Sequence, residues 1–197
     1  MLDIDADRIV ALHRQRTEDW HERPAAGAGG GGLAGLIETN HRHNFDLWHE
    51  EDKARREDMG FEYVYRAKRA IDGLNQARND TTERIDAMIA EAVGPFAADC
   101  PINSETPGMV IDRLSILALK AYHMAEQAAR TDTDADHIAA CTAKLEVIRT
   151  QRRDLAAALD QLLTEFTAGT RGFRLYRQFK MYNDPALNPQ LYRPTRD

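Results

Sequence analysis

Three common features are scarce in this 197-residue chain: long apolar runs, positive charge and cysteine. The apolar run at residues 109–111 is cut at once by Asp112 and Arg113, so we expect no membrane-spanning helix. The net charge of -6 argues against broad, non-specific binding of nucleic acid. Cys100 and Cys141, the only cysteines, have neither metal-site nor redox spacing, and we expect both to be free buried thiols.

The sequence also lacks the basic start of a signal peptide, because it begins MLDIDADRIV with acidic residues. We therefore expect a cytoplasmic protein. What is present is an ordinary globular composition, with 43% hydrophobic and 29% charged residues. The length predicts one domain with short appendages.

No stretch of any length alternates with the two-residue period of a strand, whereas several long segments repeat apolar residues at helical spacing. These segments predict an all-α protein, a bundle of four to five helices with an extended, aromatic-rich C-terminal tail that wraps the bundle. We expect an N-terminal helix within 1–23, a glycine-rich linker at 24–32, and the bundle with its tail at 33–197. The expected bundle helices span about 33–58, 61–93, 107–130 and 134–168.

The second expected helix has the wrong side chains for a face that packs in a core. Steps of three and four residues along it pass through Ile37, His41, Asn44, Trp48, Glu51 and Arg55. A helix that is polar all round is normally a solvated spacer or is unstable. We favour a third option, in which this face borders a polar cavity. The last helix, by contrast, has a conventional apolar seam with one polar interruption, Arg152.

The helix expected near 107–130 is apolar on nearly every side, as in the middle of a bundle, yet it carries Asp112, Lys120 and His123. Burying charged groups costs free energy unless they are paired or meet a ligand. One interpretation is a salt-bridge network between helices, with Asp112 bound to Arg55 or Arg78. The other places Asp112 and His123 in a polar pocket, and we favour it because two separate helices show the same anomaly.

Metal-binding patterns in the sequence are weak. His49 and Asp52 lie three residues apart on one helix face, with His41 and His43 nearby, so imidazole and carboxylate ligands are at hand. We expect no cofactor, with Mg²⁺ bound through a phosphorylated substrate as the alternative, and leave the metal undefined.

A second acidic pattern pairs Glu83 with Asp86 in the order Glu-x-x-Asp. All-α nucleotide pyrophosphatases combine such a helix with a Glu-rich one, for which Glu50, Glu51 and Asp52 are the candidates here. The spacing within that group does not fit the usual three-residue step, and a solvated face is the simpler interpretation of Glu83 and Asp86.

Basic and amide side chains fall on the inward phases of three expected helices. Guanidinium and ammonium groups suit a phosphate or carboxylate, and amides suit sugar hydroxyls. The basic candidates are Arg55, Arg78 and Lys120, and the amides are Asn44, Asn75 and Asn79. In the tail, Lys180, Tyr182 and Asn183 are candidates for a strap that closes over the site.

Three segments together, NFDLWHEEDKAR, ETPGMVIDRLSILALKAYHM and RQFKMYNDPALNP, resemble the bacterial DUF4254 family, and the middle one is also similar to DUF6165. The resemblance runs from about Leu36 to Tyr192. It implies a helical architecture and, because members are often encoded near glycosyltransferases of surface-glycan assembly, chemistry on sugars or sugar nucleotides. Arg113 departs from the lysine common in relatives, and the glycine-rich linker looks particular to this chain.

The resemblance and the helical phases single out nearly the same residues. As catalytic acid–base groups we expect His49, Asp52, Asp112 and His123. As substrate-binding groups we expect Asn44, Trp48, Glu51, Arg55, Arg78, Asn79, Lys120, Lys180, Tyr182 and Asn183.

The resulting hypothesis is an enzyme acting on a phosphorylated sugar, a sugar nucleotide or a sugar-containing metabolite in glycan or secondary-metabolite biosynthesis. One alternative is a non-catalytic helical partner of a glycosyltransferase, and another is a Mg²⁺-dependent hydrolase similar to all-α pyrophosphatases. We expect a small-molecule substrate, no nucleic acid and no membrane, and the apolar seams allow a homodimer.

Overall fold

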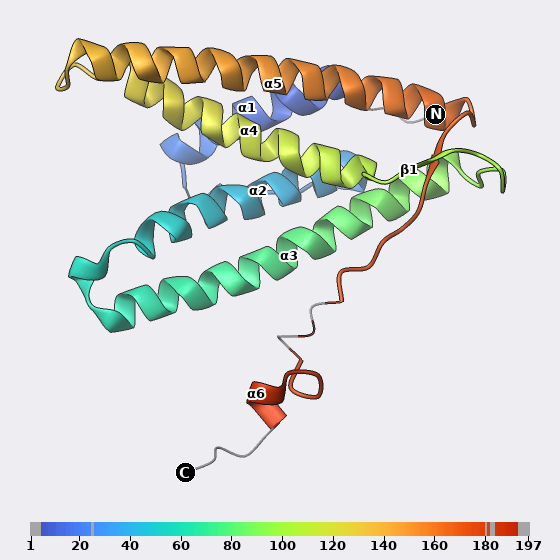
Figure 1. Cartoon of the computed structure of the whole chain (residues 1–197), viewed down its shortest axis with the longest axis horizontal. Helices are drawn as coiled ribbons and strands as arrows, with labels where there is room; N and C mark the ends of the chain where they lie inside the picture. The colour runs from blue at the N-terminus through green and yellow to red at the C-terminus, as the bar shows by residue number, and fades with distance from the viewer. Residues whose placement is uncertain (1–4, 25, 180, 182–183, 193–197) are drawn as a thin grey trace.

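The computed structural model describes residues 5–24, 26–179, 181 and 184–192. Within these ranges nearly all regular structure is helical, so the all-α prediction is confirmed (Figure 1). The long helices are α1 (Ala6–Glu22), α2 (Gly32–Lys53), α3 (Phe61–Val93), α4 (Pro107–Ala128) and α5 (Ala135–Thr167). The short ones are the 3₁₀ helix η1 (Glu57–Met59) and α6 (Pro189–Tyr192). No helix in the described part has the length and apolarity needed to cross a bilayer.

Capping residues explain where three of the long helices begin. Asp5, Thr106 and Asp134 each accept a hydrogen bond from the backbone N–H three residues further on, at the starts of α1, α4 and α5. Pro107 takes the first position of α4, where its missing N–H costs nothing. These residues set the helix starts within one or two residues of the expected ones.

The second helix ends earlier than expected, at Lys53 rather than near residue 58. The Arg55 N–H bonds the Asp52 carbonyl at 3.2 Å, and the Arg56 N–H bonds the Lys53 carbonyl at 3.1 Å. Bonds of this three-residue span tighten the last turn of a helix and end it. Gly60, at φ 88°, then makes the turn into α3.

Helix α4 lies in the middle of the bundle and contacts all four other long helices. It pairs most extensively with α5, while α2 pairs with α3, and the two pairs stack as Figure 1 shows. The largest apolar cluster draws on all five helices through Ile9, Ile37, Ile85, Ile89, Ile111, Leu114, Leu159 and Phe166. Cys100 and Cys141 are free and buried, as expected.

The segment after α5 first closes one end of the bundle and then leaves it. Strand β2 (Gly172–Phe173) pairs in parallel with β1 (Ile102–Asn103). Arg177 and the Gln178 backbone bind Glu83 on α3. Beyond this contact the chain runs away from the helices towards α6, so its described part crosses α3 instead of wrapping the bundle (Figure 1).

Candidate functional site

The polar residues expected on α2 and α4 are brought together inside the bundle, around Asp112. The Arg78 Nε and Nη2 atoms donate to Asp112 Oδ1 and Oδ2 at 2.8 and 2.7 Å, from α3. Asn44 Nδ2 and Asn40 Nδ2 on α2 donate to Oδ1 at 2.9 and 3.2 Å. These contacts match the salt-bridge interpretation, with Arg78 as the partner. They hold α2, α3 and α4 together through one carboxylate.

The same network continues to α1 through a buried histidine that the sequence did not single out for this role. Asn44 also donates to Ser115 Oγ at 3.0 Å, and Ser115 Oγ lies 2.7 Å from His41 Nδ1. His41 Nε2 lies 3.0 Å from Thr17 Oγ1, whose hydroxyl donates to the His13 carbonyl. A neutral His41 carrying its proton on Nε2 satisfies every one of these bonds. Burial is the main cause that lowers the pKa of His41 to about 3.

Three imidazoles lie close together near Trp48, at the C-terminal ends of α2 and α4. His123 stacks on Trp48, with ring centroids 4.6 Å apart and planes 10° apart. The His49 centroid is 6.1 Å from that of His123, and the centroid of His21 on α1 lies 5.4 Å from His49 and 5.1 Å from His123. The structure therefore brings Trp48, His49 and His123 together as expected, and adds His21. Nothing in the α1 periodicity marked His21, because the position of α1 against α2 and α4 is set only by the fold.

Two of these imidazoles, His21 and His123, each have one ring nitrogen with a hydrogen-bond partner and one without. His21 Nδ1 bonds the Thr17 carbonyl at 2.7 Å, and His123 Nδ1 bonds Glu126 Oε2 at 2.8 Å. The Nε2 atoms of both rings are buried and have no hydrogen-bond partner among the described residues. Burial, followed by the neighbouring charges of His21 and His123, lowers the pKa of His49. His49 is therefore held in its neutral form, which can act as a general base.

The remaining expected residues are spread over the surface. The Arg55 guanidinium binds Glu51 at 2.9 Å. Lys120 is exposed in a shallow groove between α4 and α5, and Asp52 is also exposed. The three expected cations, Arg55, Arg78 and Lys120, thus do not converge on one point, because they occupy different sides of the bundle. Asn79 is half-buried on α3, and Lys180, Tyr182 and Asn183 lie outside the described residues.

Glu83 and Asp86 do not form a metal-binding face with the acidic residues of α2. Glu83 binds the tail, as described above, and Asp86 accepts hydrogen bonds from Thr106 Oγ1 and the Gly108 N–H at 2.6 Å each. Burial raises the pKa of Asp86 to about 6, and these two bonds offset part of the rise. Within the described ranges no three His, Cys, Asp or Glu side chains are grouped so as to hold a metal ion.

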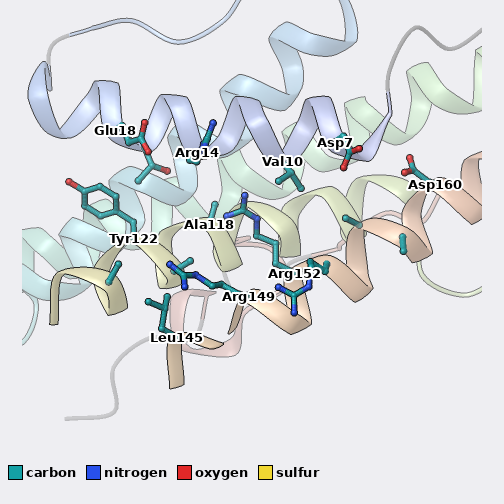
Figure 2. A pocket seen from close by; sticks show the side chains of 16 residues that line it. Asp7, Val10, Arg14, Glu18, Ala118, Tyr122, Leu145, Arg149, Arg152 and Asp160 are labelled. Atoms are coloured by element: carbon teal, nitrogen blue, oxygen red, sulfur yellow. The ribbon is translucent and has the colours of Figure 1, made fainter. Parts of the chain in front are cut away.

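A cavity of about 690 Å³ lies on the other side of α4, between α1, α4 and α5 (Figure 2). Small residues form its floor, namely Ala118, Ala121, Ala125, Ala156 and Ala157. Four arginines line it: Arg14 on α1, and Arg149, Arg152 and Arg153 on α5. We call this cavity the arginine trough. Its volume is that of an ordinary small-molecule site.

Two of the trough arginines, the exposed Arg14 and the half-buried Arg152, differ from the other two in having no partner in the described part of the chain. Arg14 and Arg152 make no hydrogen bond or ion pair with any described residue, whereas Arg149 binds Glu146. In Figure 2 the Arg152 side chain reaches from α5 towards α1 and Ala118. Burial, and then the charge of Arg14, lower the pKa of Arg152. Two guanidinium groups in this setting favour an anionic ligand.

Sequence reasoning missed the arginine trough, although one signal pointed to it. Arg152 is the polar residue that interrupts the apolar seam of α5. Because a seam residue faces the bundle, a cation at that position indicates a polar space between helices. The contribution of Arg14 depends on how α1 packs and had no signal of its own.

The family model described as "Protein of unknown function (DUF4254)" matches residues 34–175, which is more than two thirds of the chain. The chain belongs to the DUF4254 family. The match contains the residues of the polar network on α2, α3 and α4, together with His49 and His123. Arg14, Thr17 and His21 on α1 lie outside it, and it ends before the tail motif that begins at Arg177. No curated protein and no solved structure matches the chain.

Proposed function

We propose that this DUF4254 protein is an enzyme that acts on a phosphate-bearing sugar metabolite, a phosphorylated sugar or a sugar nucleotide, in glycan or secondary-metabolite biosynthesis. The observation that supports this most is the pair of partnerless arginines, Arg14 and Arg152, in the arginine trough. The chain carries a net charge of -6. Arg14 is exposed and Arg152 is half-buried, so both guanidinium groups are open to an anion from solvent, and together they form a local site of positive charge that would attract one.

The other groups of the site have roles that fit the same substrate class. Asp7 and Glu18 line the trough away from its centre and can accept hydrogen bonds from sugar hydroxyls (Figure 2). Tyr122 lines the trough and also stacks on His21, with centroids 4.2 Å apart, so the imidazole group begins where the trough ends. In this proposal His49 or His123 is the general acid or base. Asp112 acts indirectly, by fixing α2 and α4.

A thermal-shift screen tests whether the trough takes phosphate compounds. The full chain is heated with pyrophosphate, glucose 1-phosphate and glucose, each with and without Mg²⁺. A ligand at one hundred times its dissociation constant stabilises a protein by about 2.7 kcal/mol, which raises Tm by several degrees. We expect the phosphate compounds to raise Tm and free glucose to have no effect.

Two variants locate the binding. Arg152→Met should abolish the Tm rise with phosphate compounds, while Lys144→Met, a change of cation outside the trough on the same helix, should leave it unchanged. If no phosphate compound raises Tm, or if both variants respond like the wild type, the proposal is wrong. Catalysis is tested separately, by following phosphosugar turnover with His123→Gln, which should lower kcat without abolishing binding.

A second candidate function has its own supporting observation. Phe61 is 84% exposed and stacks on Tyr65, and Phe179 of the tail is 85% exposed. Exposed aromatic residues of this kind are typical of surfaces that meet other proteins. They favour a helical protein that docks on a glycosyltransferase, or a homodimer. Co-purification with such an enzyme, together with no response to phosphate compounds, would favour this candidate over the first.

A further inference from the structure

We infer that the arginine trough binds a nucleoside diphosphate, with the flat base against Tyr122 and the phosphates between Arg14 and Arg152. This inference rests on the proposed function, because it names the class of phosphate compound that the same site takes. It is carried by three features of the trough: its length, the position of Tyr122, and the separation of Tyr122 from the arginines.

The trough is elongated, which argues against a ligand as small as inorganic phosphate. Its lining on α5 runs from Leu145 to Asp160. Fifteen residues correspond to about 22 Å along a helix. A single phosphate or a small phosphosugar would fill only part of a cavity of about 690 Å³. A nucleoside diphosphate is long enough to span from one end of the trough to the arginines.

Tyr122 supplies a rigid aromatic surface at one end of this space. One side of its ring is covered by His21, whose plane is 19° from parallel. His21 is itself fixed by the hydrogen bond to the Thr17 carbonyl. A ring held in this way loses little conformational entropy on stacking against a second ring. Because every nucleobase has a π-face, such a surface favours nucleotides over sugar phosphates.

The arginines lie about one helical turn from this aromatic end. Tyr122 and Ala118 line the trough four residues apart on α4, as do Glu18 and Arg14 on α1, so each step is about 6 Å. That separation leaves room for a ribose between the base and the first phosphate. Glu18 lines the trough beside Tyr122, and carboxylates commonly accept hydrogen bonds from ribose hydroxyls.

The charge distribution along the trough also fits a diphosphate better than a uniformly anionic ligand. Arg14 and Arg152 are near the middle, whereas Asp7 and Asp160 face each other at the end opposite Tyr122 (Figure 2). Carboxylates repel a chain of phosphates that extends further, but they can bind the hydroxyls of a sugar attached to the second phosphate. The expected order along the trough is therefore base, ribose, diphosphate and then hydroxyls. This order places the sugar at the end away from His49 and His123, so where it holds, the acid–base groups nearest the sugar are Asp7 and Asp160 and not these histidines.

Isothermal titration calorimetry of the full chain with UDP, ADP, pyrophosphate and ribose 5-phosphate tests the inference. We expect UDP or ADP to bind at least about tenfold more tightly than pyrophosphate or ribose 5-phosphate. Tyr122→Leu should weaken nucleotide binding by at least about fivefold, the range for loss of base stacking, and leave pyrophosphate binding unchanged. Arg152→Met should weaken all four ligands.

Two controls keep the outcome interpretable. Tyr122→Phe retains the ring and should bind nucleotides like the wild type, and Tyr65→Leu removes an exposed tyrosine outside the trough and should also have no effect. If pyrophosphate binds as tightly as UDP and ADP and Tyr122→Leu changes nothing, the nucleotide inference is overturned while the proposed function stands. If no ligand binds, or if Arg152→Met binds all four normally, both are overturned.

Discussion

Arg78 on α3 and Asp112 on α4 are joined by two parallel hydrogen bonds of 2.8 and 2.7 Å inside the bundle. The Asp112 side chain is only 9% exposed and that of Arg78 is 25% exposed. Such a two-pronged pair fixes both the separation and the rotation of the helices that carry it. Asn40 and Asn44 bring α2 into the same contact.

The first prediction is that Asp112→Asn lowers the free energy of unfolding by about 3 kcal/mol. The substitution leaves a largely buried guanidinium without its counter-charge, which is the costly way to break an internal ion pair. Arg113→Gln on the next residue is the control, since Arg113 binds Glu105 at the surface and should change stability by less than about 1 kcal/mol. Urea unfolding of both variants measures the difference, and equal losses would contradict a structural role for the network.

The helices themselves were predictable because their signals are local. Thr106 and Pro107 mark the start of α4, and Gly60 marks the break before α3, whatever the rest of the chain does. The polar phase of α2 likewise marked Asn44, which we expected to line a polar cavity and bind substrate, and which the structure places in the hydrogen-bond network around Asp112. The structure buries Asn44 to 4% exposure.

The site was less predictable because its members depend on relations between helices. Sequence spacing could not decide whether Asp112 meets Arg55 or Arg78, since both lie on inward phases of neighbouring helices. To predict the arginine trough or the role of His21, one must know where α1 packs against the other helices. Helix α1 is joined to α2 through a glycine-rich segment, and such a segment does not fix the orientation of one helix relative to the other. Lys120 was misjudged for a related reason. Helix α4 packs against other helices on several sides, so its sequence does not show which of its polar residues reach solvent. Lys120 reaches solvent in the groove between α4 and α5.

The second prediction concerns the contact of α3 with the start of α4. A Cβ on Gly108 would lie 2.7 Å from the Thr82 carbonyl oxygen and 2.8 Å from Asp86 Oδ1. Gly108→Ala should therefore separate the helices and lower the free energy of unfolding by about 2 kcal/mol. Gly73→Ala is the matched control. A Cβ there meets nothing within 4 Å, and alanine is the better helix former, so we expect a gain of about 0.5–1 kcal/mol.

Thermal or urea unfolding of the two glycine variants checks this prediction. A loss of stability in Gly73→Ala as large as in Gly108→Ala would show that the close approach of the helices is not the cause.

The third prediction is that Glu83 holds the tail against α3. Its carboxylate accepts from Arg177 Nη1 at 2.8 Å and from the Gln178 N–H at 2.9 Å. Glu83→Ala should increase the rate of trypsin cleavage at Arg174 and Arg177 several-fold, because a tail without these bonds samples extended, cleavable conformations more often. The free energy of unfolding should change by less than about 1 kcal/mol, since the contact is exposed.

Limited proteolysis followed by mass spectrometry measures those cleavage rates. Glu91→Ala, at an exposed position on the same helix, is the control and should be cleaved like the wild type. Equal cleavage of Glu83→Ala and Glu91→Ala would mean that Glu83 does not anchor the tail.

The last prediction follows from two buried rings, His13 and His41, whose centroids are 4.5 Å apart. Burial is the main cause that lowers both pKa values, that of His41 to about 3. The folded state therefore keeps the rings neutral, while the unfolded chain takes up protons below about pH 6.5. The stability that comes from keeping the rings neutral is complete above pH 6.5 and is lost as the pH falls. The slope is about 1.4 kcal/mol per pH unit for each ring as long as the pH stays above the folded pKa of that ring, which is about 3 for His41.

His13→Phe isolates half of this effect. Both nitrogens of His13 are buried without a hydrogen-bond partner in the described part of the chain, so an apolar ring of similar shape should be tolerated at pH 7. Urea unfolding between pH 7 and pH 4 should then show that the free energy of unfolding of the variant rises relative to that of the wild type, by about 1.4 kcal/mol for each pH unit below pH 6. Asp86 acts in the opposite direction, because its raised pKa makes protonation favour the folded state, but it is common to both proteins and cancels in the difference. Parallel pH curves for the two proteins would mean that His13 is not held neutral in the fold.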